Sequence, residues 1–131
     1  TYELGDVRDL IPEQGRYDVI LCLGILYHLE PGDALALLAT MRQTAERFAV
    51  VDTHIGQPGA TVEVDGRTYH GHWFHETPGH PWSAVRNAVS WWFTEQSLAD
   101  AIYAAGWHDI EPVLGQSWSQ EAPDRRWLVI S

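Results

Sequence analysis

The sequence has 131 residues, enough for one domain but too few for two well-packed ones. Acidic residues outnumber basic residues by 18 to 8, and the formal net charge of −10 argues against a groove that binds nucleic-acid phosphates. All basic residues are arginine, which excludes Schiff-base chemistry on lysine, and a single cysteine, Cys22, excludes an internal disulfide. The sequence shows neither a signal peptide nor an apolar run of membrane-spanning length, so we expect a cytoplasmic protein that does not enter a membrane.

The first half of the chain has the pattern of a strand–helix–strand unit. Residues 17–26 are almost continuously apolar, which is typical of a central parallel strand buried on both faces. The next segment predicts a helix with Asp33 as its N-cap. Its apolar positions, three and four residues apart, are Leu35, Leu38, Met41, Ala45 and Phe48. A second buried strand is expected over residues 48–53, parallel to the first because one helix joins them.

The middle of the chain has a different pattern. Residues 61–69 alternate around Asp65-Gly66, a dipeptide typical of two-residue hairpin turns, and predict a small antiparallel hairpin. Residues 70–83 are rich in Gly, Pro, His and Trp, and we expect a long loop there.

The last part of the chain predicts one helix and two strands. Thr94 is expected to cap the helix at its start, and Gly106 to end it. Strands are expected over residues 107–114 and 126–130, joined by a polar turn.

Three segments in this order resemble the class I S-adenosylmethionine (SAM)-dependent methyltransferases. Residues 5–10 (Gly-Asp-Val-Arg-Asp-Leu) are similar to the turn after the third strand of that family. Residues 17–29, which contain Leu-Gly-Ile-Leu-Tyr-His, resemble its fourth strand and the following loop. Residues 92–107 resemble its late helix and the aromatic residue that follows it.

The resemblance implies a Rossmann-like α/β fold with SAM as cofactor. It covers only the second half of the family pattern, so residues 1–131 are expected to form the C-terminal part of a single methyltransferase domain whose N-terminal glycine-rich part is missing. The hairpin and the His/Trp-rich loop form an insertion at about residues 57–90. We expect this segment alone to be inactive, and to self-associate through an open sheet edge.

The resemblance also implies a set of cofactor-binding residues. Asp6 and the amide of Val7 correspond to the residues that bind adenine, although Asp6 also suits a simple turn. Leu23 and Gly24 would line the methionine end of SAM, and Tyr27 would contact the cofactor or the transferred group, with ordinary packing as the alternative for all three.

Two further residues have candidate roles in the reaction. His28 is the candidate catalytic base or substrate contact, because an imidazole has a reference pKa of about 6.5, and the alternative is a hydrogen bond to a neighbouring loop. Arg86 is a candidate cofactor contact that would pair with a carboxylate, and an internal salt bridge is the alternative.

Residues 70–83 contain types that zinc or iron also takes as ligands, namely His70, His72, His75, Glu76 and His80. The surrounding Gly and Pro residues argue against a closed structural site, so no metal is predicted. Four tryptophans in this region, Trp73, Trp82, Trp91 and Trp92, indicate an aromatic wall over a substrate pocket. For Trp91 and Trp92, packing in the core is the alternative.

The sequence therefore predicts SAM-dependent methyl transfer to a small-molecule acceptor held under the His/Trp-rich loop. The nearest branch resembles the tRNA wobble-uridine carboxymethyltransferases, on the basis of residues 23–28 and Val-Arg-Asn at 85–87, but the net charge disfavours tRNA as a partner. A non-catalytic methyltransferase-like binding subunit and a metal-dependent protein remain as alternatives.

Overall fold

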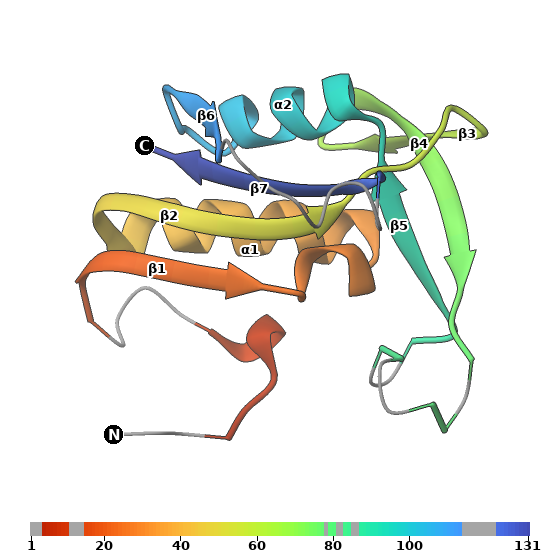
Figure 1. Ribbon diagram of the computed structural model, residues 1–131, viewed down its shortest axis with the longest axis horizontal. Helices are drawn as coiled ribbons and strands as arrows, with labels where there is room; N and C mark the ends of the chain where they lie inside the picture. Colours follow the sequence, from red (N-terminus) through yellow and green to blue (C-terminus); the bar gives the residue numbers. More distant parts are fainter. Residues whose placement is uncertain (1–3, 11–14, 78, 81–82, 85–86, 114–122) are drawn as a thin grey trace.

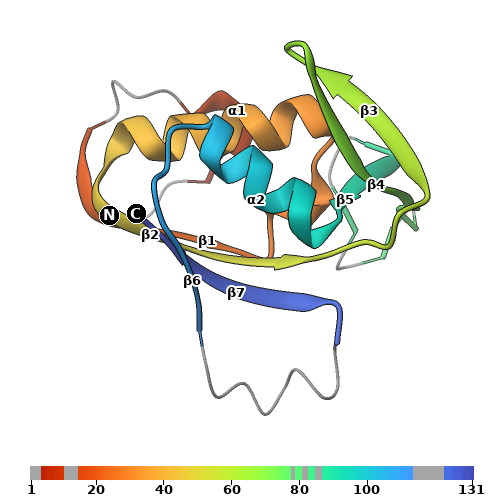
Figure 2. The ribbon, with the colours of Figure 1, turned by 90° about the horizontal axis from the view of Figure 1, so that it is seen from above.

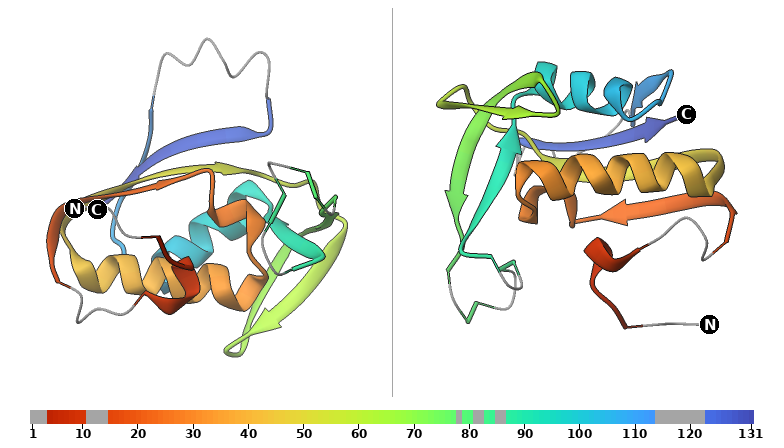
Figure 3. Two further views of the ribbon diagram at one scale, coloured as in Figure 1. Left: turned by 90° about the horizontal axis from the view of Figure 1, so that it is seen from below. Right: turned by 180° about the vertical axis from the view of Figure 1, so that it is seen from behind.

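The computed structural model describes residues 4–10, 15–77, 79–80, 83–84, 87–113 and 123–131. Four strands form a larger sheet in the order β1 (Tyr17–Leu23), β2 (Ala45–His54), β7 (Arg125–Ile130) and β6 (Ile110–Pro112). Three strands form a smaller antiparallel sheet in the order β3 (Ala60–Val64), β4 (Arg67–His75) and β5 (Val89–Phe93). Helices α1 (Pro31–Thr44) and α2 (Glu95–Ala104) lie on the same side of the larger sheet (Figures 2 and 3).

The smaller sheet stands at the end of the larger sheet where β1 and β2 finish (Figures 1 and 3). The two sheets and the two helices bury one core, in which Leu38, Val51 and Trp91 are completely inaccessible. No helix within the described ranges is long and apolar enough to cross a membrane. The predicted α/β fold class is confirmed.

The strand–helix–strand unit is confirmed, with different boundaries. Strands β1 and β2 are parallel, and their register aligns Leu23 with Asp52. The helix begins at Pro31 after the N-cap residue Glu30, so the prediction of Asp33 as N-cap was wrong. Proline suits this first turn because its φ is already helical and its missing N–H would have had no partner there. The helix ends at Thr44, so Ala45 and Phe48 belong to β2 rather than to its apolar stripe.

The first strand is not buried on both faces. Its even positions Ile20 and Cys22 pack against the core, whereas Leu21 is 64% and Tyr17 is 55% exposed. The face of the larger sheet opposite α1 and α2 is not covered by any helix that the structure describes (Figure 2). Within the described part of the chain, β1 is also the edge strand of its sheet. The expected burial of this strand on both faces is therefore wrong, whereas the expected open sheet edge is present at β1 within the described residues.

The hairpin is confirmed, and the loop after it is shorter than predicted. Asp65 and Gly66 have φ values of 51° and 73°, the left-handed conformation that a tight two-residue turn requires. Residues 70–75, expected in a loop, extend β4 and pair with β5, so that His72 lies opposite Trp92. This segment, which is rich in histidine and aromatic residues, forms a strand because β5 supplies backbone partners that the local sequence does not reveal.

The last helix forms as predicted. The Thr94 side chain accepts a hydrogen bond from the Ser97 amide at 3.2 Å, and Gly106 has a φ of +92° after the helix end. The indole N–H of Trp107 donates to the Leu38 carbonyl at 3.1 Å and fixes α2 against α1. Of the strand predicted over residues 107–114, only Ile110–Pro112 is a strand, and residue 114 lies outside the described residues.

We predict that residues 1–131, expressed alone, self-associate through β1, because an unpaired strand edge beside exposed apolar side chains favours pairing with another chain. Leu21→Lys should raise the dissociation constant about tenfold, or by ~1.4 kcal/mol, because it charges the exposed face. Sedimentation velocity over a concentration series measures this. Tyr103→Lys, which makes a similar change at an exposed site on α2, serves as the control. A wild-type chain that stays monomeric over the series would contradict the prediction.

Candidate active site

Three adjoining clefts open where β1 and β2 end. The first has a volume of about 540 Å³ and contains Asp6, Val7 and Ile25 in its wall. The second, of about 620 Å³, is lined among others by Leu23, Gly24, Tyr27, Asp52, Arg125 and Trp127. The third, of about 290 Å³, lies toward the smaller sheet and is lined among others by Tyr27, Phe74, Glu76, His80 and Trp92. His28 and Ser83 line all three clefts.

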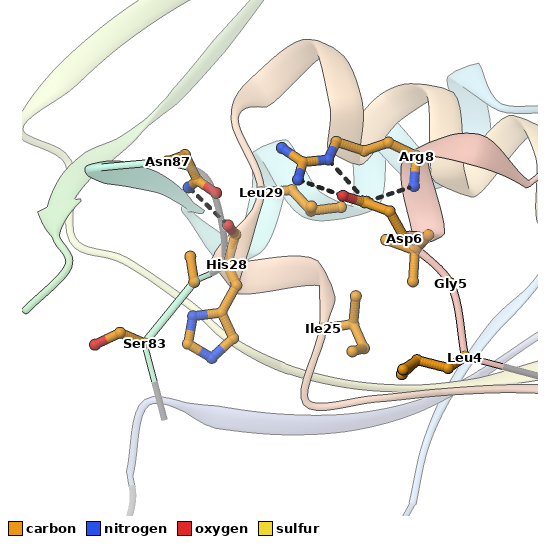
Figure 4. A pocket seen from close by; sticks show the side chains of 11 residues that line it. Leu4, Gly5, Asp6, Arg8, Ile25, His28, Leu29, Ser83 and Asn87 are labelled. Carbon is orange, nitrogen blue, oxygen red and sulfur yellow. Dashed lines mark hydrogen bonds and ion pairs between the residues drawn. The ribbon is translucent and has the colours of Figure 1, made fainter. Parts of the chain in front are cut away.

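At one end of the first cleft, Asp6 begins the 3₁₀-helix η1 (Val7–Asp9) (Figure 4). Its carboxylate accepts hydrogen bonds from the backbone and the guanidinium of Arg8, at distances of 2.6 to 3.1 Å. These bonds raise the pKa of Arg8 above its ordinary value. Asp6 therefore forms a turn, which was the alternative to a role in binding adenine. It also lines the first cleft together with Val7.

The residues after β1 enter the second cleft. Gly24 has a φ of +70°, a conformation that favours glycine, and its amide donates to the Asp52 carbonyl at 3.2 Å. The 3₁₀-helix η3 (Leu26–His28) follows and places Tyr27 beside Gly24. Burial, reinforced by the nearby carboxylates of Asp52 and Glu76, raises the pKa of Tyr27, so its phenol stays protonated at neutral pH and is able to donate a hydrogen bond.

His28 forms a hydrogen-bonded pair with Glu76, a residue on the segment after β4. Nδ1 of His28 lies 2.9 Å from Oε1 of Glu76, whose side chain is only 4% exposed. The carboxylate also accepts hydrogen bonds from the Ser90 hydroxyl at 2.8 Å and the Ala84 amide at 3.1 Å. Burial alone raises the pKa of Glu76, but the hydrogen bonds from His28, Ala84 and Ser90 together outweigh it, so the pKa lies below its ordinary value.

A charged pair, Asp52 with Arg125, joins β2 to β7 at the floor of the second cleft. Asp52, which is 1% exposed, accepts two hydrogen bonds from the Arg125 guanidinium, and Nε of Arg125 lies 2.7 Å from Oδ1. These bonds raise the pKa of Arg125. In the sequence, Asp52 stands out as an acidic residue at the end of an apolar run. No sequence pattern identifies Arg125 as its partner.

Aromatic rings form the wall between the second and third clefts. The ring of Trp92 stacks on Phe74 with a centroid distance of 4.6 Å and on His54 with a distance of 4.8 Å. His54 in turn contacts the edge of Tyr27 at 4.5 Å. Of the tryptophans expected to form an aromatic wall, Trp92 lines the third cleft, Trp91 is fully buried in the core and Trp73 is exposed.

Two of the residues singled out from the sequence, Trp82 and Arg86, lie outside the described residues. The histidines expected together in one loop do not all lie in a loop, because His70, His72 and His75 belong to β4 and only His80 follows it. Among the described residues, no group of three or more His, Cys, Asp or Glu side chains is arranged to hold a metal ion.

We predict that Asp52→Asn lowers the free energy of unfolding by about 1–3 kcal/mol, because it removes the charged acceptor of Arg125 at a buried site. Asp18→Asn, at an exposed position of β1, should change it by less than about 0.5 kcal/mol. Urea denaturation of the two variants measures the difference. Equal effects would show that the pair with Arg125 does not stabilise the fold.

No family model and no curated protein matches the chain. Among solved structures, the N-terminal domain of EvdMO1 with SAH bound is similar, with a TM-score of 0.73 and 25% identity over 98% of this chain and 51% of that chain. The Burkholderia thailandensis 1,6-didemethyltoxoflavin-N1-methyltransferase, with its substrate and S-adenosylhomocysteine bound, has a TM-score of 0.52 and 19% identity, covering 95% of this chain and 46% of that one.

A SAM-dependent methyltransferase from Mesorhizobium loti has a TM-score of 0.56 and 17% identity over 99% of this chain and 67% of that chain. The chain thus spans about half the length of the solved EvdMO1 domain that it matches. The chain thus has the fold of the SAM-dependent methyltransferases among these solved structures.

Proposed function

We propose that residues 1–131 supply the C-terminal part of a methyltransferase domain that transfers a methyl group from SAM to a small-molecule acceptor. The observation that carries this proposal is the meeting of three clefts at His28, at the carboxyl ends of two parallel strands. In open α/β sheets, ligands bind outside those strand ends. The similar EvdMO1 domain contains SAH, which supports SAM as the cofactor.

The residues present fit SAM. The first cleft offers the Asp6 carboxylate and the Val7 backbone, which suit the adenine edge, and the second offers the surface of Leu23 and Gly24 for the methionine end. Both clefts are within the usual size range of small-molecule sites. SAM would supply a methyl group that its positively charged sulfur already activates.

The third cleft is proposed to hold the acceptor. Phe74 and Trp92 provide a stacked aromatic surface, and His28 lies where this cleft meets the other two. A stacked aromatic surface beside the carboxylate of Glu76 suits a small organic molecule rather than a phosphate backbone. His28 is the residue that would take a proton from the acceptor.

We predict that Asp6→Ala weakens the binding of S-adenosylhomocysteine to the complete polypeptide by about 1–3 kcal/mol, the usual cost of removing one partner of a buried polar contact. Isothermal titration calorimetry measures this. Asp9→Ala, at an exposed position of the same 3₁₀-helix, should leave the affinity unchanged. Unchanged affinity in a folded Asp6→Ala variant would remove Asp6 from the cofactor site, and a wild type that does not bind would contradict the proposed function.

We also predict that His28→Gln slows methyl transfer about 100-fold, because it removes the proton acceptor, while the affinity for S-adenosylhomocysteine stays within about threefold. Single-turnover kinetics with radiolabelled SAM and the calorimetric titration separate the two effects. Equal losses in rate and affinity would show that His28 holds the cofactor instead.

A further inference from the structure

We propose that Glu76 is a positioning residue that fixes His28 with Nε2 facing the clefts, and that the acceptor group is therefore a hydroxyl. This inference rests on the proposed function and adds to it a second residue and a substrate class. Glu76 lies 48 residues from His28 in the sequence, on the segment that leaves β4, and the sequence pattern suggests it only as a metal ligand.

The hydrogen bonds around Glu76 decide which nitrogen of His28 carries the proton. An ionised carboxylate only accepts hydrogen bonds, and Glu76 accepts one each from Ala84 and Ser90 in addition to the bond with His28. Nδ1 of His28 must therefore be the donor. In the neutral ring, Nε2 is then the nitrogen with a free electron pair.

The position of the ring leaves this electron pair available. No hydrogen bond joins Nε2 to any residue that the structure describes, and the His28 side chain is 21% exposed. The backbone carbonyl of His28 accepts a hydrogen bond from the Asn87 amide at 2.9 Å, which holds the residue from the other side (Figure 4). The ring is thus fixed at Nδ1 and at its backbone, and Nε2 is the atom left for a ligand.

A base fixed in this way is needed only for certain acceptors. A neutral amine attacks with its own electron pair and loses its proton afterwards, whereas a hydroxyl attacks well only as its proton leaves. SAM would supply the methyl group: the hydroxyl oxygen would bond to the methyl carbon as the electron pair of the carbon–sulfur bond stays on sulfur, and Nε2 of His28 would take the hydroxyl proton. The buried carboxylate of Glu76 then stabilises the resulting imidazolium.

Glu76→Gln tests this arrangement because an amide is unable to satisfy all the donors. If its oxygen faces Ala84, its NH₂ group faces His28, and Nδ1 must become an acceptor, which moves the proton to Nε2. Nitrogen-15 NMR of the histidine side chains, with the His28 signals assigned by comparison with His28→Gln, reports the tautomer at a pH where the ring is neutral. We expect the Nδ1–H form in the wild type and in Glu63→Gln, an exposed carboxylate change on the same hairpin, and loss of that form in Glu76→Gln.

This measurement needs neither SAM nor an acceptor, so it does not depend on the proposed function. An Nε2–H tautomer in the wild type overturns the inference, even if Glu76→Gln does not fold. Failure of the complete polypeptide to bind S-adenosylhomocysteine would instead overturn the proposed function.

The hydroxyl assignment is tested with phenol and aniline, two probes of the same shape that differ in the attacking group. For phenol, we expect kcat to fall about 100-fold in Glu76→Gln with KM within about threefold, and for aniline we expect kcat to change less than about threefold. Equal losses with both probes, or a wild type that methylates aniline but not phenol, overturn the assignment.

Discussion

The parallel pairing of β1 with β2 determines where the site forms, because it ends both strands at the same edge of the sheet. Leu23 lies beside Asp52 in this register, and the Gly24 amide bonds to the Asp52 carbonyl as the chain leaves the strand. The left-handed conformation of Gly24 then turns the chain into the short helix that carries Tyr27 and His28. The same Asp52 holds Arg125, so one buried carboxylate fixes both the sheet and the floor of the second cleft.

The smaller sheet completes the site from a distant part of the sequence. The backbone amide of Trp91 in β5 donates to the Leu29 carbonyl at 2.9 Å, which attaches this sheet directly to the segment that follows His28. Glu76 and Trp92 reach the clefts through this attachment. The segment between β2 and α2 therefore brings an aromatic surface and a carboxylate to the strand end that carries Tyr27 and His28.

Much of the fold could be predicted from local patterns. The βαβ unit, the Asp65-Gly66 hairpin and the Thr94 cap each depend on residues close together in the sequence. The burial of β1 and the extent of β4 could not be predicted, because both depend on which strands are neighbours. The apolar residues of β1 suit a strand covered on both faces, while the described structure leaves Leu21 open on one of them.

In the candidate site, too, the features that depend on local sequence could be predicted and the distant contacts could not. Tyr27 was identified through the family resemblance and His28 as a candidate base, and both line the clefts in the structure. Their partners were not identified as such, since the contacts of His28 with Glu76 and of Asp52 with Arg125 join residues 48 and 73 positions apart. Asp6 and Val7 face the first cleft, but their contact with a cofactor is still a prediction.

The most direct test of this account is a crystal structure of the complete polypeptide grown with S-adenosylhomocysteine. We expect the adenine edge against Asp6 and Val7, the sulfur near Tyr27, and His28 still bonded through Nδ1 to Glu76. A ligand bound away from these clefts, or a His28 ring turned from Glu76 in its presence, would contradict the account.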